Sequence, residues 1–247
     1  MVSDVHLGNP LYRPQRPFVD FLRYAYEQEC PVCINGDGVD ILQSSITRLA
    51  RDLAGCNREF ARFASRGLPI YYTVGNHDMA LEQFLDDWGV IRVVPFLNLL
   101  SGDRRIRIEH GHLYDEMFVR YPRIYAGMTL LGAATLRVSP TAFRVFHDLN
   151  RPVIALGEWR HGSHKGTDEA STLARQIPGE RAAFLRGAIE IAERGFDAVI
   201  FGHTHRHGQI ELSNGATYYN TGFWHHDPYF AEVVRGEIVL KAVSEIR

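Results

Sequence analysis

The chain has 247 residues, enough for one large hydrophobic core, and its 45% hydrophobic and 23% charged content is that of an ordinary globular protein. Its formal net charge of -2 gives no overall attraction to nucleic acid or to an anionic membrane, so either partner would require a local basic patch. No apolar run reaches the ~18 residues of a membrane span, and no secretory signal precedes Ser3. We therefore expect a cytoplasmic protein, with at most a peripheral contact to a membrane.

The three cysteines, Cys30, Cys33 and Cys56, are typical of a protein from a reducing compartment. Cys30 and Cys33 have the spacing of a redox motif, but no second pair of cysteines or histidines lies near them in the sequence. Because residues 32–34 are predicted to form a core strand, we interpret these thiols as small packed side chains and not as redox or zinc ligands.

The first half of the chain alternates between predicted helices and strands. One helix is predicted to begin at Pro17, and a second begins after Ser44 or Ser45, either of which would be its N-cap. A short third helix is expected at 80–88. Strands are predicted at 32–35, 69–74, 90–94, 96–100 and 105–109. Only two residues precede Ser3, too few for a strand ahead of it, so we expect the natural chain to begin several residues earlier.

The pattern changes in the second half. Residues 115–178 are predicted to form a helical insertion within a single domain of residues 1–247, with helix-like segments at 124–138 and 140–149 and a polar stretch at 161–168. A further helix at 179–194 is followed by predicted strands at 197–201, 208–212, 216–219, 230–234 and 238–242.

Polar motifs follow apolar runs at five points of the chain. They are Ser3-Asp4-Val5-His6, Asn35-Gly36-Asp37-Gly38-Val39-Asp40, Val74-Gly75-Asn76-His77-Asp78, Glu109-His110-Gly111-His112 and Gly202-His203-Thr204-His205. In an α/β protein the carboxyl ends of the strands share one edge of the sheet, so we expect these side chains to lie together. Imidazole, carboxylate and amide donors in one place suit manganese, iron or zinc. The motifs therefore predict a metal site.

Their order and spacing over residues 3–205 resemble those of the calcineurin-like metallophosphoesterases. The resemblance implies an α/β fold, a four-layered α/β/β/α sandwich of two mixed sheets, with a site for two divalent metal ions. We expect Mn²⁺, with iron or zinc as alternatives. By the same resemblance, one ion is held by Asp4, His6, Asp37 and His205, and the other by Asp37, Asn76, His110 and His203. Asp37 would bridge the ions, since a carboxylate has two separable oxygen donors.

The resemblance also implies a reaction, in which a metal-bridging hydroxide attacks a phosphoester or a pyrophosphate. His77 would donate a proton to the leaving oxygen or stabilise the phosphoryl charge, and Asp78 would orient His77. Asp40 is expected to fix the geometry of a ligand. The motif requires His110 but not His112.

Two other groups of residues have open interpretations. Arg206 and His207 either contact phosphate or are solvated loop residues, and His225 and His226 are interpreted as surface histidines. Between Met117 and Lys165, seven basic residues oppose two acidic ones, a net charge of +5. Residues 124–136 carry no charge and are apolar on nearly every side. They form either a helix buried on the core or a lid that binds acyl chains or a membrane.

Tyr114-Asp115 and the arginine-rich insertion are similar to the branch of UDP-2,3-diacylglucosamine pyrophosphatases, although that branch typically has arginine at the position of His77 and aspartate at that of His112. The similarity implies a lipid-linked pyrophosphate as substrate, with small phosphomonoesters or phosphodiesters as the alternative. A catalytically silent interaction module would show gaps in its ligand set, and this sequence has none. We expect no nucleic acid partner, because the chain leaves no room for a capping domain and the basic patch is interleaved with aliphatic residues.

Overall fold

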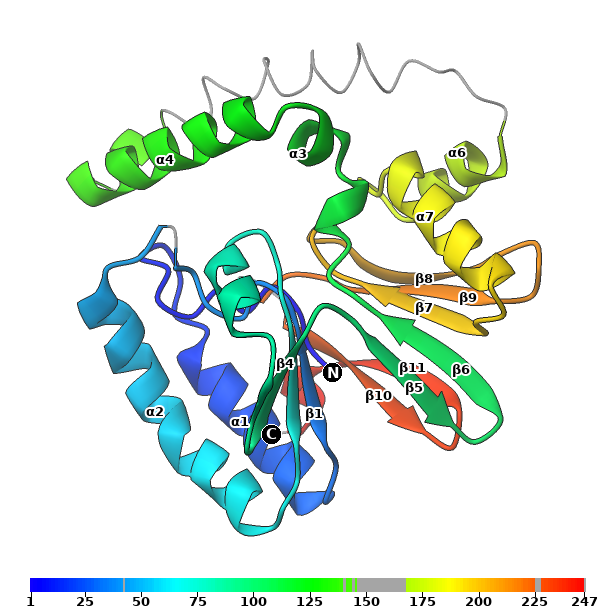
Figure 1. Ribbon diagram of the computed structural model, residues 1–247, viewed down its shortest axis with the longest axis horizontal. Coiled ribbons are helices and arrows are strands. Elements are labelled where there is room, and N and C mark those ends of the chain that lie inside the picture. Colours follow the sequence, from blue (N-terminus) through cyan, green and yellow to red (C-terminus); the bar gives the residue numbers. More distant parts are fainter. Residues whose placement is uncertain (42, 140, 144, 146–167, 225–227, 247) are drawn as a thin grey trace.

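The computed structural model describes residues 1–41, 43–139, 141–143, 145, 168–224 and 228–246 (Figure 1). Its first sheet has the strand order β1-β2-β4-β3, with the bounds β1 (Val32–Asn35), β2 (Ile70–Thr73), β3 (Asp87–Trp88) and β4 (Ile91–Val94). Strands β1, β2 and β4 are parallel, and β3 is antiparallel to β4. Helices α1 (Gln15–Glu27) and α2 (Ile46–Ser65) belong to the same hydrophobic core as this sheet, to which Phe18, Phe63 and Ile70 each contribute a buried side chain.

Helix α2 begins as predicted behind Ser45, whose hydroxyl accepts a hydrogen bond from the amide of Arg48 (3.3 Å). Just beyond its end, Gly67 has a φ of 64°, a conformation that glycine adopts without steric cost. Both ends of this helix are therefore explained by local sequence.

The prediction of a helix at 80–88 was wrong. A 3₁₀ helix, η1 (Met79–Phe84), is followed there by strand β3. The chain leaves the helical path because the side chains of Asp86 and Asp87 accept hydrogen bonds from nearby backbone amides, at 2.7 and 2.9 Å. Phe84 is 50% exposed, so an α-helix at this position would gain little from burial.

The second sheet has the order β5-β6-β7-β9-β8, with the bounds β5 (Leu97–Ser101), β6 (Arg104–Ile108), β7 (Ala198–Phe201), β8 (His207–Glu211) and β9 (Thr217–Thr221). Its three central strands are parallel and its two edge strands antiparallel to them. The remaining elements of this half are α6 (Glu169–Leu173), η3 (Ala174–Gln176), α7 (Ala182–Glu193), the antiparallel pair β10 (Tyr229–Val234) and β11 (Glu237–Ala242), and η4 (Val243–Ile246).

The alternation of side chains along β7 shows how the layers are stacked. Val199 and Phe201 are buried with residues of α6 and α7, whereas Ala198 and Ile200 belong to a separate core that Cys33 of β1 also joins. That core lies between the two sheets, so the order of layers is helices, sheet, sheet, helices (Figure 1). The predicted α/β fold with mixed sheets is confirmed.

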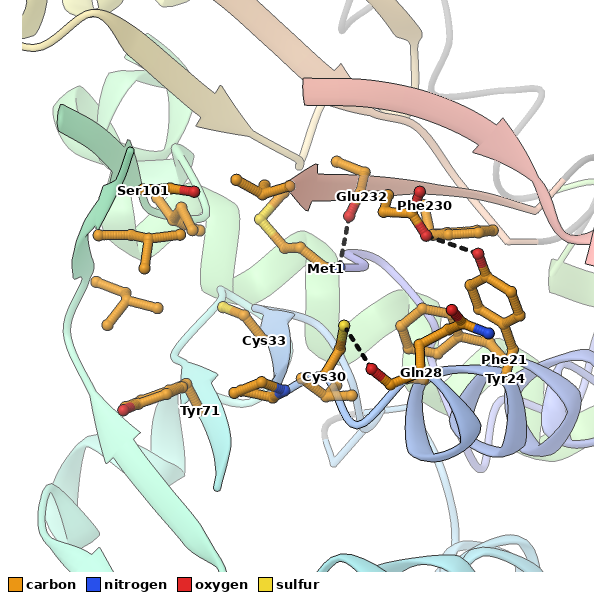
Figure 2. A pocket seen from close by; sticks show the side chains of 18 of the residues that line it. Met1, Phe21, Tyr24, Gln28, Cys30, Cys33, Tyr71, Ser101, Phe230 and Glu232 are labelled. Atoms are coloured by element: carbon orange, nitrogen blue, oxygen red, sulfur yellow. Dashed lines mark hydrogen bonds between the residues drawn. The ribbon is translucent and has the colours of Figure 1, made fainter. Parts of the chain in front are cut away.

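A pocket of about 220 Å³ lies between the first sheet and strand β10 (Figure 2). Met1, Cys30, Cys33, Tyr71 and Phe230 are among the residues that line it. Both cysteines are free thiols, and burial raises the pKa of Cys33 to about 12. A thiol of that pKa is a poor nucleophile at neutral pH, which supports the interpretation of a packed side chain.

The chain between the two halves forms α3 (Glu116–Arg120) and α4 (Pro122–Val138), which lie on the same side of the molecule as the loops after β1 and β2 (Figure 1). The helix predicted at 124–138 is confirmed. Of the segments predicted at 140–149 and 161–168, the structure describes only residues 141–143, 145 and 168, and residues 141–143 and 145 are helical. Within the described part of the chain, no helix has both the length and the apolar character required to cross a bilayer.

Candidate metal centre

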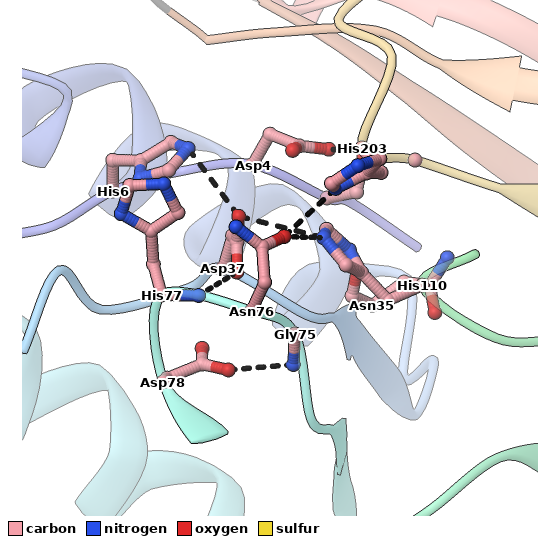
Figure 3. A network of polar contacts seen from close by, with 12 residues as sticks. Asp4, His6, Asn35, Asp37, Gly75, Asn76, His77, Asp78, His110 and His203 are labelled. Atoms are coloured by element: carbon pink, nitrogen blue, oxygen red, sulfur yellow. Dashed lines mark hydrogen bonds and ion pairs between the residues drawn. The ribbon is translucent and has the colours of Figure 1, made fainter. Parts of the chain in front are cut away.

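The predicted ligands meet at the ends of the central strands (Figure 3). The N-terminal segment runs beside the loop after β1, because the amides of Asp4 and His6 donate to the carbonyls of Gly36 (3.2 Å) and Asp37 (2.8 Å). The loop after β7 lies beside the loop after β6 through a hydrogen bond from the Gly202 amide to the His110 carbonyl (3.1 Å). The structure thereby brings together all seven residues predicted as ligands: Asp4, His6, Asp37, Asn76, His110, His203 and His205.

Five of these residues have an unusual backbone conformation. Asp4, His6, Asp37, His203 and His205 have φ angles of 52°, 52°, 50°, 67° and 60°. Among the described residues only two other non-glycine positions have a positive φ. The conformation costs a residue with a Cβ atom roughly 1–2 kcal/mol. Strain of this kind persists where surrounding contacts hold it, and it tends to gather at functional sites.

Asp4, His6 and His205 form a first group of potential ligands. Nε2 of His205 lies 3.2 Å from Oδ1 of Asp4, and Nε2 of His6 lies 3.8 Å from Oδ2 of Asp37. Asp4 and His6 are buried, whereas the His205 side chain is 40% exposed and stacks on Phe223 with a centroid separation of 4.2 Å. His205 therefore connects this group to solvent.

Asp37, His110 and His203 form a second group, to which Asn76 is bonded. Nε2 of His110 lies 3.4 Å from Oδ2 of Asp37 and 3.3 Å from Oδ1 of Asn76, and Nδ1 of His203 lies 2.7 Å from the same amide oxygen. Nδ1 of His110 is 2.9 Å from the carbonyl oxygen of Asn35. A hydrogen bond donated there leaves the lone pair of Nε2 directed at the group, as in many histidine ligands.

Several buried atoms in this region make no hydrogen bond within the described part of the protein. They are Oδ1 of Asp4, both ring nitrogens of His6, and Nδ1 of His112. Leaving a buried polar atom unsatisfied costs about 1–3 kcal/mol, so such atoms normally have a partner. Oxygen and imidazole donors that converge without partners fit a divalent cation, and the donor set suits Mn²⁺, iron or zinc.

The protonation states of the buried side chains also suit a bound cation. Burial alone would raise the pKa of Asp4, but the nearby His110 and His205 lower it to about 2, so the carboxylate is ionised. Burial lowers the pKa of His6 to about 4, which leaves its imidazole neutral and able to ligate. For His110, the carboxylates of Asp37 and Asp4 outweigh burial and raise the pKa to about 10. A cation bound here would compete with that proton.

His77 lies at the edge of the first group. Its Nδ1 is 3.3 Å from Oδ1 of Asp40, and Oδ2 of Asp40 lies 3.8 Å from Nδ1 of His6. Asp40 therefore contacts two imidazoles, as expected of a carboxylate that fixes a ligand. The ring of His77 also lies within ligand range of His6 and Asp37, so the geometry allows it a ligand role that the sequence analysis did not consider.

The expected pairing of Asp78 with His77 was wrong. Oδ1 of Asp78 accepts a hydrogen bond from the Gly75 amide (2.6 Å; Figure 3). Its Oδ2 accepts from the Gly38 amide (3.1 Å) and from the hydroxyl of Tyr72. These buried amides need an acceptor, so the carboxylate turns inward and ties together the loops after β1 and β2. The carboxylate that contacts the His77 ring is Asp40.

Two residues that contact the proposed ligands, and a third that contacts the loop between His203 and His205, were not predicted as part of the site. Oδ2 of Asp115 lies 3.0 Å from Nε2 of His203, the hydroxyl of Tyr125 accepts from Nδ2 of Asn76 (2.7 Å), and Glu180 accepts from the hydroxyl of Thr204 (3.0 Å). Asp115 lies five positions after His110, and the sequence indicated it only through the similarity of Tyr114-Asp115 to the pyrophosphatase branch. Tyr125 lies in an apolar run and Glu180 in a turn, and the sequence around them has no pattern that predicts a polar contact.

The other singled-out residues lie at the edge of the cluster or away from it. His112 is buried, with its ring 5.5 Å from that of His110. Arg206 is exposed, with its side chain against Gly179, and His207 is exposed and stacks on Tyr229 at 4.1 Å. Arg206 therefore resembles a solvated loop residue, and His207 an exposed residue at the start of β8, more than a phosphate ligand. His225 and His226 lie outside the described residues.

Several solved structures are similar to this chain at low sequence identity. An archaeal phosphodiesterase is 16% identical, with 98% of this chain and 96% of that chain covered and a TM-score of 0.43. A predicted phosphoesterase from Streptococcus pneumoniae TIGR4 is 15% identical, with 98% and 94% covered and a TM-score of 0.37. Vacuolar protein sorting 29 from Cryptosporidium parvum is 12% identical, with 98% and 93% covered and a TM-score of 0.41. No curated protein sequence matches the chain.

The family comparison is more specific than these structures. The sequence model of the calcineurin-like phosphoesterases matches residues 1–207, a span that contains all five motifs and every residue of the cluster. The chain therefore belongs to the calcineurin-like phosphoesterase family.

Proposed function

We propose that the protein is a metal-dependent hydrolase of phosphoesters or pyrophosphates that binds two divalent ions. The observation that carries this proposal is the position of Asp37, whose Oδ2 lies 3.8 Å from Nε2 of His6 and 3.4 Å from Nε2 of His110. One buried carboxylate thus stands between two groups of imidazoles. It is the arrangement expected of a ligand shared by two ions.

Seven residues would hold the pair. Asp4, His6, Asp37 and His205 would bind the first ion, and Asp37, Asn76, His110 and His203 the second. Such a pair, when bound, supplies Lewis acidity to the phosphate oxygens and lowers the pKa of an attacking water. Mn²⁺ is our first choice because the set mixes carboxylate and amide oxygens with imidazole nitrogens.

We assign His77 to proton donation toward the leaving oxygen. Its side chain is 17% exposed, so a substrate can reach it, and its contact with Asp40 (3.3 Å) restricts the orientation of the ring. Asp40 is a positioning residue in this scheme, while Asp78 holds the loop that carries His77.

Replacing His77 by alanine tests this assignment. His77→Ala should retain its metal ions but lose about 10²–10⁴-fold in kcat on alkyl phosphoesters, the usual contribution of a positioned acid. The loss should be small on nitrophenyl esters, whose leaving group needs little protonation. His207→Ala, which removes an exposed imidazole stacked on Tyr229, is the matched control and should change neither rate. An equal loss on both substrate classes would favour charge stabilisation, and loss of a metal ion would make His77 a ligand.

Gly75 gives a steric test of the metal site. A Cβ atom at this position would clash with Oδ1 of Asp37 and lie 2.6 Å from its amide nitrogen, so Gly75→Ala must displace the shared carboxylate. Mn²⁺ affinity, measured by calorimetric titration, should fall about 10–100-fold, the range seen when support around a metal site is lost. Gly127→Ala in α4 is the control, because a Cβ atom there meets nothing within 4 Å. Unchanged Mn²⁺ affinity in Gly75→Ala would contradict the assignment of Asp37.

We further propose a lipid-linked pyrophosphate, such as the nucleotide-linked lipid UDP-2,3-diacylglucosamine, as substrate, with peripheral membrane contact through α4. The support is a row of exposed apolar side chains on α4: Ile124 (54%), Leu130 (66%), Leu131 (58%) and Val138 (81%). Arg120 and Arg123 are exposed near the start of this helix, where they suit anionic head groups. Without a lipid role for this surface, small phosphomonoesters or phosphodiesters become the preferred substrates.

The exposed leucines separate these two substrate classes. The double variant Leu130→Ser/Leu131→Ser should lower turnover of a lipid-linked pyrophosphate in vesicles several-fold while nitrophenyl phosphate hydrolysis and melting temperature stay unchanged. Leu136→Ser is the control, because Leu136 is 4% exposed and its loss should lower the stability and both activities together. Equal turnover of the lipid substrate by the double variant and the unmodified protein would return the small phosphoesters to first place.

A further inference from the structure

Helices α3 and α4 contact the metal centre through two side chains. Asp115 is the N-cap residue of α3, with Oδ1 accepting from the Met117 amide (3.0 Å) and Oδ2 lying 3.0 Å from Nε2 of His203. Tyr125, in the first turns of α4, accepts a hydrogen bond from Nδ2 of Asn76 (2.7 Å). Both contacts therefore end on proposed ligands.

Both contacts also involve residues proposed to bind the same ion. Asn76 and His203 belong to the second group and are themselves in contact, Nδ1 of His203 lying 2.7 Å from Oδ1 of Asn76. Among the described residues, the hydrogen bonds and ion pairs of the side chains of Asp4, His6 and His205 all come from loops outside α3 and α4. The two helices are thus connected to one half of the centre.

The contact with Tyr125 helps to hold the Asn76 amide in one orientation toward the group. An amide has an oxygen with lone pairs at one end and a nitrogen without a usable lone pair at the other. The phenol hydroxyl takes the NH₂ end, so the oxygen faces the imidazoles of His110 and His203. Without the hydroxyl, Nδ2 of Asn76 loses the hydrogen-bond partner that helps to hold the amide with its oxygen toward the group.

Asp115 restrains the imidazole of His203 in a similar way. A proton on Nε2 of His203 that is donated to the carboxylate leaves the lone pair on Nδ1, the nitrogen that faces Asn76. Asp115 is itself held by the guanidinium of Arg181 (3.0 Å) and is 6% exposed, so its orientation is fixed. The carbonyl of Asn35 plays the equivalent part for His110.

We propose that Tyr125 and Asp115 are positioning residues for the second ion, so that its occupancy depends on α3 and α4 while that of the first ion does not. This inference rests on the proposed two-ion site. It gives the helices between the two halves of the fold a role at the centre itself, independent of any contact with lipid.

The test is a titration of the metal-free protein with Mn²⁺, followed by calorimetry and by electron paramagnetic resonance. The unmodified protein should bind two ions and show the signal of a spin-coupled pair. Tyr125→Phe, which removes only the hydroxyl, should bind the first ion with unchanged affinity and the second about 10–100-fold more weakly. With one equivalent of Mn²⁺, the resonance spectrum of Tyr125→Phe should match that of the unmodified protein. With two equivalents, the variant should lack the signal of the spin-coupled pair. Asp115→Asn should act in the same direction.

Tyr24→Phe is the matched control, since it also removes a half-buried phenol hydroxyl, bonded to Glu232 at 2.6 Å, far from the centre. It should leave both affinities and the coupled signal unchanged. If the unmodified protein binds two ions and Tyr125→Phe binds both as tightly, the inference is overturned and the proposed function stands. Equal weakening of both ions in Tyr125→Phe would also overturn it, because the hydroxyl would then support the whole centre. Binding of fewer than two ions by the unmodified protein would overturn the proposed function and this inference with it.

Discussion

The buried carboxylate of Asp37 is the constraint on which the rest of the site depends. It is 1% exposed, its backbone has a φ of 50°, and its Oδ1 accepts a hydrogen bond from the His77 amide (2.8 Å). Burying a charge is costly unless it is paired and hydrogen-bonded. The imidazole of His110 partly offsets that cost, and two bound cations would offset more. The same arrangement explains why the neighbouring position 75 is glycine, since a Cβ atom there would occupy the space of this carboxylate.

The fold supplies this constraint through adjacent strand ends. Parallel pairing of β1 with β2 sets Asp37 beside Asn76, and parallel pairing of β6 with β7 sets His110 beside His203. Asp78 then ties the first pair of loops by accepting from the amides of Gly38 and Gly75. Helices α3 and α4 lie on the same side of the molecule as these loops (Figure 1). They carry exposed apolar side chains and make two contacts with the candidate centre.

The sequence was sufficient to predict which side chains gather at this edge, because most of them follow a short strand, and the ends of parallel strands meet wherever the strands are adjacent. The layers were predictable for a related reason: β7 alternates between two cores, and α1 buries residues spaced three and four apart. The η1 segment was not predictable from periodicity, because the Asp86 and Asp87 side chains compete for the backbone amides there. Tyr125 and the true partners of Asp78 were missed because a single polar contact made across the fold leaves no periodic signal.

The central claim is that two metal ions share Asp37, and anomalous diffraction from crystals grown with Mn²⁺ tests it most directly. We expect two anomalous peaks about 3.5–4 Å apart. Each should lie about 2.0–2.6 Å from a carboxylate oxygen of Asp37, with Asp4, His6 and His205 around one peak and Asn76, His110 and His203 around the other. A single peak, or two peaks of which only one contacts Asp37, would contradict the account.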